Sequence, residues 1–390
     1  MASRVLLCGA DVVLPDRVAS NLTVVIEDGR IADLVAGPRE VGPGETRHDL
    51  RGHFIVPGFI DVHVHGVLGV DVMDDDAAVR TVARHLPQFG VTAFCPTSVA
   101  CSPEALASFL AAVGAARMHR DPDAARVLPA HLETGFINPD YRGAQPLEWI
   151  RPWDEIKTSG VFFSSQAPDI GIFTMAPEIP GGFDLLRAAR KAGIRVSLGH
   201  SGATYDQAIE AIELGACHAT HLYNRMSPMT HRDPGLVGAI LEREEVAAEI
   251  IADGFHVHPA AVRVAIAAKG RSRVMAITDG TAGSGLPKGS CATLGGRRIT
   301  VGETATLDDG TFAGSVATMD KVFSVLVTRS GQSLVDAATL CATTPARELG
   351  LTTQGAIVPG HMADLVVLSS SLQVTQTWIA GVRTQSPGRP

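Results

Sequence analysis

Two histidines separated by one residue, His63 and His65, are the first side chains of this 390-residue sequence whose spacing suggests chemistry. They lie in the segment FIDVHVHG, where a short apolar run predicts a strand. Because side chains alternate between the two faces of a strand, both imidazoles point to the same side. Two converging imidazoles suit a borderline-soft divalent ion, although such a pair is also found as ordinary core or loop histidines.

Further residues of the ligand type follow apolar runs later in the chain. They are Glu133 after VLPAHL, His200 after RVSLG, His221 in ACHATHL, Asp253 and His256 in AEIIADGFH, and Asp279 after VMAIT. Any one of them alone would more often be structural. Buried charges are costly unless they are paired or bound to a metal. The repetition of ligand-type residues at successive strand ends therefore predicts a shared metal site.

The middle of the chain supplies the elements that bring these strand ends together. Short apolar runs alternate with helical stretches, as in GVTAFCPTS after AAVRTVARHLPQF and IRVSLGH after FDLLRAARKAG. This alternation predicts a parallel α/β domain, and its length favours a closed (β/α)₈ TIM-like barrel over an open sheet. Such barrels keep their active sites at the C-terminal ends of the strands. We place the barrel at residues 57–353, with a β-hairpin-like insertion near 290–312.

Both ends of the chain are rich in β-branched residues bounded by turn signals. The segments NLTVVIEDGRIADLVAG near the start and GHMADLVVLSSSLQVTQTWIAGVRT near the end share this texture. Neither end has enough strands for a core of its own. We therefore predict one small β-sandwich domain built from residues 1–56 plus 354–390.

Composition narrows the class of protein. A formal net charge of −8 argues against a nucleic-acid binder, although one local arginine is enough to hold a phosphorylated substrate. The six cysteines form no CxxC pair, which is typical of reduced thiols in a reducing compartment. No apolar stretch reaches the roughly 20 residues of a membrane helix, and the first residues do not resemble a signal peptide. We expect a cytoplasmic protein that binds neither nucleic acid nor membrane.

At this point the sequence resembles a known family. The segments PGFIDVHVHG, HLETGFINP, GHSGATYDQA, THLYNRMSPMTHRDPGLVG, ADGFHVHP, ITDG and GSVATMD follow, in this order, the motifs of the N-acetylglucosamine-6-phosphate deacetylases of the amidohydrolase superfamily. The segment THLYNRMSPMTHRDPGLVG is the most specific, whereas the HxH pair is shared by the whole superfamily. The resemblance extends to GHMADLVVL near the C-terminus.

The resemblance implies a ligand set for a divalent metal. Glu133, His200 and His221 would hold the main ion and leave one position open for water. His63 and His65 would hold a second ion or support the first, so one or two ions are expected. Zn²⁺ is the default for ligands of this kind, while Fe²⁺ or another divalent ion fits them nearly as well.

The resemblance also implies catalytic roles. Asp279 would act as the general base that takes a proton from metal-bound water, the nucleophile, and passes it to the departing amine. His256 would hydrogen-bond the substrate carbonyl and stabilise the developing oxyanion. This agrees with elementary chemistry, because a metal polarises an amide carbonyl and lowers the pKa of water to about 7. A carboxylate within reach then transfers the proton.

Substrate recognition is assigned by the resemblance alone. Asn224 and Arg232 would bind the sugar phosphate, for which a guanidinium has the matching fork geometry. The alternative for Arg232 is a surface ion pair with Asp233 or another acid. Met319, in GSVATMD, matches a stretch that lines the sugar site, although it is also suited to packing.

Three positions depart from the family pattern. Thr134 stands in HLETGF where the family has HLEGPF, beside Glu133. Arg225 follows the asparagine of THLYN, where a small residue is usual. It would either add a second phosphate contact or fill the sugar pocket and select another substrate. Gln145, in GAQP, replaces a histidine that reaches into the site of the neighbouring subunit.

The expected activity is hydrolysis of the N-acetyl amide of N-acetylglucosamine 6-phosphate to glucosamine 6-phosphate and acetate. Arg225 and Gln145 leave open an amidohydrolase that acts on a different or unphosphorylated N-acetyl amino sugar, an N-acyl amino acid or a cyclic amide. A remote alternative is a non-catalytic scaffold, but such proteins typically lose metal ligands. The resemblance further implies a homodimer in which each subunit contributes to the site of the other.

Overall fold

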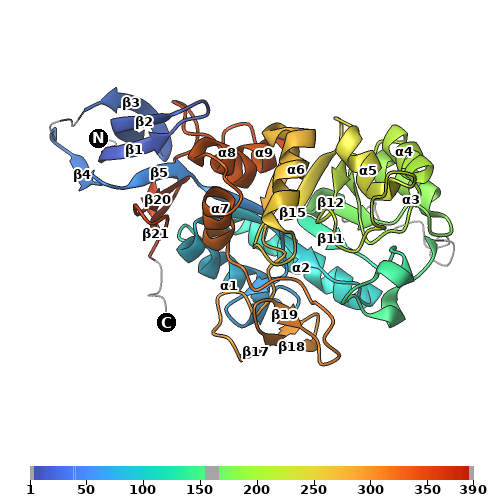
Figure 1. Cartoon of the computed structure of the whole chain (residues 1–390). Helices are drawn as coiled ribbons and strands as arrows, with labels where there is room; N and C mark the ends of the chain where they lie inside the picture. The colour runs from blue at the N-terminus through green and yellow to red at the C-terminus, as the bar shows by residue number, and fades with distance from the viewer. Residues whose placement is uncertain (1–3, 38, 40, 154–166, 386–390) are drawn as a thin grey trace.

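The computed structural model describes residues 4–37, 39, 41–153 and 167–385, and it shows an α/β barrel with a β-domain at one side (Figure 1). The barrel strands are β6 (Phe59–Val64), β9 (Val91–Ser98), β11 (Ala130–Glu133), β12 (Ile170–Met175), β13 (Arg195–Leu198), β14 (His218–Ala219), β15 (Ala247–Ile251) and β16 (Val274–Ile277). They pair in parallel in chain order, starting with β6 against β9. The predicted fold class, a (β/α)₈ TIM-like barrel with a small β-domain formed by both chain termini, is confirmed, and the strands of that domain, predicted as a sandwich, are joined in one hydrogen-bonded sheet.

The barrel closes where its first and last strands meet. Val64 bridges Gly280 in parallel, and the backbone N–H of Asp279 donates to the carbonyl of His63 at 3.0 Å. The buried Asp61 on β6 accepts a hydrogen bond of 2.5 Å from the hydroxyl of Thr278, just after β16. Burial raises the pKa of Asp61 to about 7. Closure therefore brings the HxH segment beside Asp279.

Helices cover the outside of the barrel, and within the described residues an α-helix follows each barrel strand except β11. They are α1 (Ala78–His85), α2 (Pro103–Met118), α3 (Gly182–Lys191), α4 (Tyr205–Glu213), α5 (Gly235–Glu242), α6 (Pro259–Lys269), α7 (Met319–Thr328), α8 (Leu334–Ala338) and α9 (Thr344–Glu348). Local sequence explains where several begin: Ser102 caps α2, and Thr204 with Gln207 forms a capping box on α4. No helix among the described residues is both long and apolar enough to cross a bilayer.

The β-domain is one eight-stranded sheet that joins the two ends of the chain. Its strands are β1 (Arg4–Val13), β2 (Val18–Glu27), β3 (Arg30–Ala36), β4 (Glu45–Asp49), β5 (Phe54–Pro57), β20 (Leu365–Leu368), β21 (Val374–Ile379) and β22 (Val382–Arg383). β5 pairs with β1 on one side and with β20 on the other, so the C-terminal segment completes the N-terminal sheet. The buried ion pair of Arg126 with Asp364 connects this domain to the barrel through the short strand β10 (Arg126–Val127).

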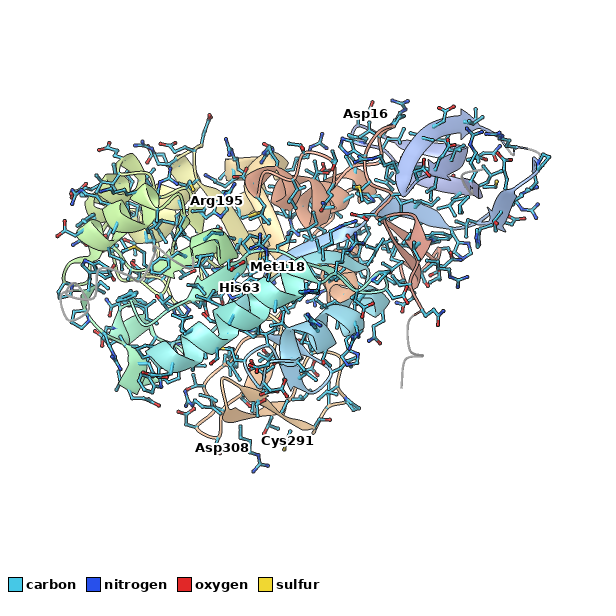
Figure 2. All side chains as sticks on the ribbon, turned by 180° about the vertical axis from the view of Figure 1, so that it is seen from behind. Asp16, His63, Met118, Arg195, Cys291 and Asp308 are labelled. Atoms are coloured by element: carbon cyan, nitrogen blue, oxygen red, sulfur yellow. The ribbon has the colours of Figure 1, made fainter. Side chains whose placement is uncertain are left out.

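A small antiparallel sheet lies at the mouth of the barrel, after β16. It contains β17 (Cys291–Leu294), β18 (Arg297–Val301) and β19 (Ala305–Thr306). Arg297 donates to the carbonyl of Ala144 at 2.8 Å, which ties this sheet to the loop after β11. A second short hairpin, β7 (Gly66–Val67) with β8 (Val70–Asp71), follows the HxH segment. In Figure 2, Cys291 and Asp308 lie on the outer side of the small sheet, far from His63 inside the barrel.

Candidate active site

Three of the expected site residues have an unusual backbone conformation at the ends of their strands. His200, His221 and Asp279 have φ angles of 49°, 32° and 48°. These values lie in the left-handed region, which non-glycine residues adopt at a cost. Such strain is concentrated at functional sites, where the surrounding structure holds it in place. Here it turns each side chain inward at the C-terminal end of the barrel.

Glu133, His200 and His221 come together as one cluster. One carboxylate oxygen of Glu133, Oε1, lies 3.0 Å from Nε2 of His200 and 3.0 Å from Nε2 of His221. The two Nε2 atoms are also 3.0 Å apart. All three side chains are almost completely buried. Their donor atoms meet at a single point beneath the mouth of the barrel.

His63 and His65 form a second cluster with Asp279 against the same glutamate. Their Nε2 atoms lie 3.3 Å apart, and Oδ1 of Asp279 is 3.3 Å from the first and 3.2 Å from the second. Glu133 lies between the two clusters, with Oε1 at 3.6 Å from His63 Nε2 and Oε2 at 3.7 Å from His65 Nε2. As predicted from the alternation of side chains along a strand, the imidazoles of His63 and His65 both face the interior of the barrel.

The orientation of the rings fits a bound cation. His65 and His200 each donate from Nδ1 to a backbone carbonyl, that of Thr97 at 3.0 Å and that of Tyr141 at 2.9 Å. Nε2 of each ring therefore faces a carboxylate oxygen, an arrangement that is favourable only when a proton or a cation lies between the two atoms. Ligands about 2.0–2.1 Å from one tetrahedral zinc ion lie about 3.4 Å from each other, close to the spacings observed here. The donor set of imidazole and carboxylate suits a divalent transition metal.

Electrostatics inside the clusters keeps the carboxylates ionised. Burial would raise the pKa of Glu133, but the neighbouring histidines, above all His200 and His63, hold it well below its usual value. Burial would lower the pKa of His221, but its hydrogen bond to Glu133 raises it to about 9. Burial would likewise lower the pKa of His65, which Asp279 raises to about 9. In the metal-free chain, positive charge on these rings takes the place that a cation would occupy.

A cavity of 420 Å³ opens directly over the two clusters. Its lining includes Glu133, His65, His200, His221 and Asp279 on the chemical side. The remaining lining comes mainly from the loops after β11, β14 and β15 and from the region of the small sheet. A cavity of this size, with a few convergent polar groups in its wall, is typical of a small-molecule site.

His256 is held at the edge of this cavity by its own loop. Its Nδ1 donates to Oδ2 of Asp253 at 2.7 Å, and its backbone N–H donates to Oδ1 of the same residue at 2.9 Å. The other ring nitrogen, Nε2, lies 3.4 Å from the hydroxyl of Thr304. Phe312 contacts the ring edge-on with centroids 5.8 Å apart. Asp253 thus fixes the ring so that Nε2 is the nitrogen available toward the cavity.

Asn224, Arg225 and Gln145 also line the cavity. Arg225 lies against Gly143, where an added Cβ would come within 2.8 Å of its Nε, so the glycine makes room for the guanidinium. The side-chain amide of Gln145 is hydrogen-bonded at both ends, unlike that of a residue that is free to bind a substrate. Its amide N–H₂ donates to Oε2 of Glu133 at 2.6 Å, and its oxygen accepts from the backbone N–H of Ala100 at 2.7 Å. Gln145 therefore reaches the metal cluster through Glu133.

Two expected substrate contacts are not brought into the cavity. Met319 begins α7, is 1% exposed and packs in the main hydrophobic core. It lines a separate small cavity next to Asp61. Arg232 is exposed on the loop after β14 and does not line the 420 Å³ cavity. Neither Arg232 nor Arg225 forms an ion pair with a residue in the described part of the chain, so the alternative pairing of Arg232 with Asp233 is not seen.

The sequence interpretation missed several side chains that support or border the site. Glu249 is fully buried below the ligands and bonds to His63, and His131 lies beside it. A single acid inside the apolar run VAAEII was a detectable signal for Glu249. His131 shares its strand face with Glu133, two residues away. Tyr141, Tyr223 and Phe312 line the cavity from loops, where spacing alone gives no signal.

This fold and this arrangement of ligands agree with a match at the level of sequence families. The Amidohydrolase family matches residues 54–384, a range that includes every barrel strand and all the residues of both clusters. The chain therefore belongs to the amidohydrolase family.

Within that family the chain is similar to amino-sugar phosphate deacetylases along nearly its whole length. It is 34% identical over 387 residues to N-acetylglucosamine-6-phosphate deacetylase of Bacillus subtilis, covering 98% of this chain and 97% of that protein. It is also 34% identical over 355 residues to N-acetylgalactosamine-6-phosphate deacetylase of Escherichia coli O157:H7, covering 90% and 93%. The resemblance inferred from the motifs is confirmed.

A solved structure supports the same grouping. A variant of N-acetyl-D-glucosamine-6-phosphate deacetylase from Mycobacterium smegmatis, solved in complex with N-acetyl-D-glucosamine-6-phosphate, matches with a TM-score of 0.87. The identity is 30%, and the match covers 98% of this chain and 99% of that one. The barrel, the β-domain and their arrangement are therefore common to the two proteins.

Proposed function

We propose that the chain hydrolyses the N-acetyl amide of N-acetylglucosamine 6-phosphate, giving glucosamine 6-phosphate and acetate. The observation that carries the proposal is the meeting of two histidine clusters with Glu133 and Asp279 at the floor of one cavity. The named relatives give the chemical class of the substrate. The complete set of ligand-type residues argues against a non-catalytic scaffold.

Asp279 is the proposed general base. Its Oδ1 is 3.2–3.3 Å from the Nε2 atoms of His65 and His63, so it lies beside the ligands and faces the cavity. A divalent ion bound there would polarise the amide carbonyl and acidify a water. Asp279 accepts the proton of the attacking water and passes it to the amine as the C–N bond breaks, so that the acyl group leaves as acetate.

His256 is the proposed stabiliser of the carbonyl oxygen. Its Nδ1 is held by Asp253, which leaves Nε2 as the ring nitrogen directed toward the cavity. An N–H at Nε2 would donate to the oxygen on which charge develops. The contact with Phe312 limits rotation of the ring.

Recognition of the sugar phosphate is proposed to involve Asn224, Arg225 and Arg232. Arg225 is the one arginine among the described residues that line the cavity, and it has room there because of Gly143. This location supports a direct phosphate contact rather than a blocked pocket, since a guanidinium binds phosphate oxygens bidentately. Arg232, exposed nearby in sequence, would act at the cavity edge or across the interface of a homodimer.

The metal is proposed to be zinc, held by Glu133, His200 and His221, with His63 and His65 able to hold a second ion. Imidazole and carboxylate ligands at these spacings suit Zn²⁺, and Fe²⁺ prefers a similar set. Gln145 fits this proposal as a supporting residue, because its bond to Oε2 of Glu133 leaves Oε1 directed at His200 and His221.

A second candidate substrate is N-acetylgalactosamine 6-phosphate. The relative from Escherichia coli O157:H7 that carries this name is as similar in identity as the relative from Bacillus subtilis. The two sugars differ only in the configuration of one hydroxyl, which a loop-lined cavity can distinguish.

The deciding experiment measures acetate release by the zinc-loaded protein from four substrates. These are N-acetylglucosamine 6-phosphate, N-acetylgalactosamine 6-phosphate, unphosphorylated N-acetylglucosamine and an N-acetyl amino acid. We expect the highest kcat/KM for the first. A preference for the second would replace the sugar in the proposal. Equal activity on phosphorylated and unphosphorylated N-acetylglucosamine would contradict the proposed phosphate contact. Activity on none of the sugars would refute the proposed function.

A further inference from the structure

Glu249 is a fully buried carboxylate beneath the metal ligands, and none of the roles described so far involves it. It lies on β15 with no exposed surface. Its Oε2 accepts a hydrogen bond of 2.9 Å from Nδ1 of His63 and a longer one of 3.4 Å from the backbone N–H of His221. A carboxylate placed inside a barrel in this way needs an explanation, because its burial is costly.

The outer nitrogen of each metal-facing histidine has a different partner. His65 and His200 donate from Nδ1 to backbone carbonyls, and Nδ1 of His221 is buried with no hydrogen-bond partner among the described residues. His63 alone of the four is supported by a carboxylate. A carboxylate behind an imidazole fixes which nitrogen carries the proton and makes the other nitrogen a stronger ligand.

The rest of the buried polar network does not compete for Glu249. Nδ1 of His131 donates to the carbonyl of Val62 at 3.0 Å, and its Nε2 accepts from the hydroxyl of Thr174 at 2.7 Å. The Thr174 hydroxyl is also hydrogen-bonded to the hydroxyl of Thr220 at 2.7 Å, and the Thr220 hydroxyl is bonded to that of Ser197 at 2.6 Å. His131 is therefore satisfied without Glu249, whose Oε1 it approaches only to 3.6 Å.

Among the described residues, the second oxygen of Glu249, Oε1, has no hydrogen-bond partner, and no lysine or arginine there pairs with this carboxylate. Its one strong contact is the proton on His63, whose Nε2 consequently carries a lone pair directed at His65 and Asp279. The arrangement is costly for folding alone and is explained if it serves the ligand.

We propose that Glu249 is a positioning residue that holds His63 with its Nε2 lone pair toward His65 and Asp279 and thereby sets the affinity of the His63–His65 half of the centre for a divalent ion. The inference rests on the proposed function only in requiring that the centre binds a metal. It assigns a division of labour, in which the Glu133–His200–His221 half is oriented by backbone and the His63–His65 half by a buried charge.

The test compares zinc binding by the metal-free wild-type chain and by Glu249→Gln. Zn²⁺ is titrated against a competing chelator, and the bound metal is counted by mass spectrometry. We expect the affinity at the His63–His65 half to fall about 10–100-fold, while the other half changes by less than threefold. A Glu249→Gln variant with wild-type stoichiometry and affinity overturns the proposal, whether the wild type holds one ion or two.

Two further variants keep the result interpretable. Ser197→Ala removes a hydroxyl from the same buried network but contacts neither Glu249 nor His63, and we expect wild-type zinc binding from it. If Ser197→Ala loses affinity equally, the effect is general core disruption and the proposal fails. Glu249→Asp keeps the charge but shortens the side chain. It should show the same selective loss even if Glu249→Gln does not fold, and wild-type affinity in Glu249→Asp overturns the proposal.

The readout also separates this inference from the proposed function. Zinc binding is measured without substrate, so absence of deacetylation in the wild type would refute the proposed function and leave this test intact. The melting temperature of the metal-free Glu249→Gln variant should equal or exceed that of the wild type, because a buried carboxylate with one unpaired oxygen has been neutralised. A merely structural role for Glu249 predicts a lower value and no selective loss of metal.

Discussion

The two sides of the cavity are built in opposite ways. On the metal side, all five proposed ligands are buried, and four of them are held by a second contact: His65 by Thr97, His200 by Tyr141, His63 by Glu249 and Glu133 by Gln145. Thr97 and Glu249 lie on barrel strands, and Tyr141 and Gln145 lie on the loop after β11. The geometry of the ligands is therefore over-determined before any metal or substrate arrives.

On the recognition side, the side chains come from loops and have few partners. Arg225 and Arg232 are exposed, and Phe312 is 54% exposed. Loops tolerate sequence change better than strands, and they carry specificity on a fixed scaffold. This contrast indicates that the reaction type is set by the barrel, while the choice of substrate depends on residues of the loops. The two sides should respond differently to substitution.

The largest effect is expected on the metal side, from Asp279→Asn. The amide keeps the shape of the side chain but loses the ability to accept a proton, so kcat should fall about 10²–10⁴-fold. Zinc content and melting temperature should change little, because Asp279 is not one of the Glu133–His200–His221 ligands. Steady-state kinetics together with metal analysis checks this. Near-normal turnover would refute the role of Asp279 as base.

Lowering the pH should have the next largest effect, and it should weaken metal binding without acting on the recognition side. His65 and His221 have pKa values raised to about 9, so in the metal-free chain both carry protons below that pH. A bound ion must displace these protons, so zinc affinity should fall about tenfold per pH unit for each proton released as the pH drops from 8 to 6. Calorimetry in buffers of different ionisation enthalpy counts the protons. A pH-independent affinity would contradict the assignment.

On the recognition side, Arg225→Ala should have the largest effect. Losing a charge-assisted contact to phosphate costs about 1.5–3 kcal/mol, which corresponds to a rise in KM of about 10-fold or more. The kcat should change much less, because no metal ligand is touched. Arg225→Lys is the matched control that keeps the charge and loses the fork. If Arg225→Ala instead lowers the KM for an unphosphorylated sugar, the guanidinium fills the pocket.

The sequence predicted the metal side far better than the recognition side. The physical reason is that the metal side is built mainly from strand ends and the recognition side from loops. Strand alternation and strand ends fix the direction of His63, His65 and Asp279, and both can be read from the sequence. No periodicity predicts where a loop side chain such as Arg232 or Phe312 ends up. Gln145 was expected at the substrate, whereas its bond to Glu133 depends on how the loop after β11 returns over the barrel. The single acid in VAAEII marks Glu249 in the sequence, but its contact with His63 exists only once β6 and β15 lie in the same barrel, so the sequence could not predict that partner.

A smaller effect is expected from Arg232→Ala. The side chain is exposed and outside the cavity of the single chain, so its contribution to the phosphate contact is screened by water or requires a second subunit. KM for the phosphorylated sugar should rise more than kcat falls, and less than in Arg225→Ala. An unchanged KM would remove Arg232 from the phosphate site. A larger rise in KM than in Arg225→Ala would indicate that a second subunit completes the recognition side. Sedimentation of the wild type should then show a dimer.

The smallest effect is expected from Met319→Leu, where the boundary between the cavity and the core is tested directly. Met319 is buried at the start of α7 and packs against the barrel core, so a volume-conserving change should cost less than about 1.5 kcal/mol of stability. KM and kcat should remain within twofold, because the side chain does not line the 420 Å³ cavity. Kinetics and thermal unfolding of the same preparation measure both quantities. A selective rise in KM without loss of stability would mean that α7 moves on binding and that the recognition side extends deeper into the barrel than the described cavity.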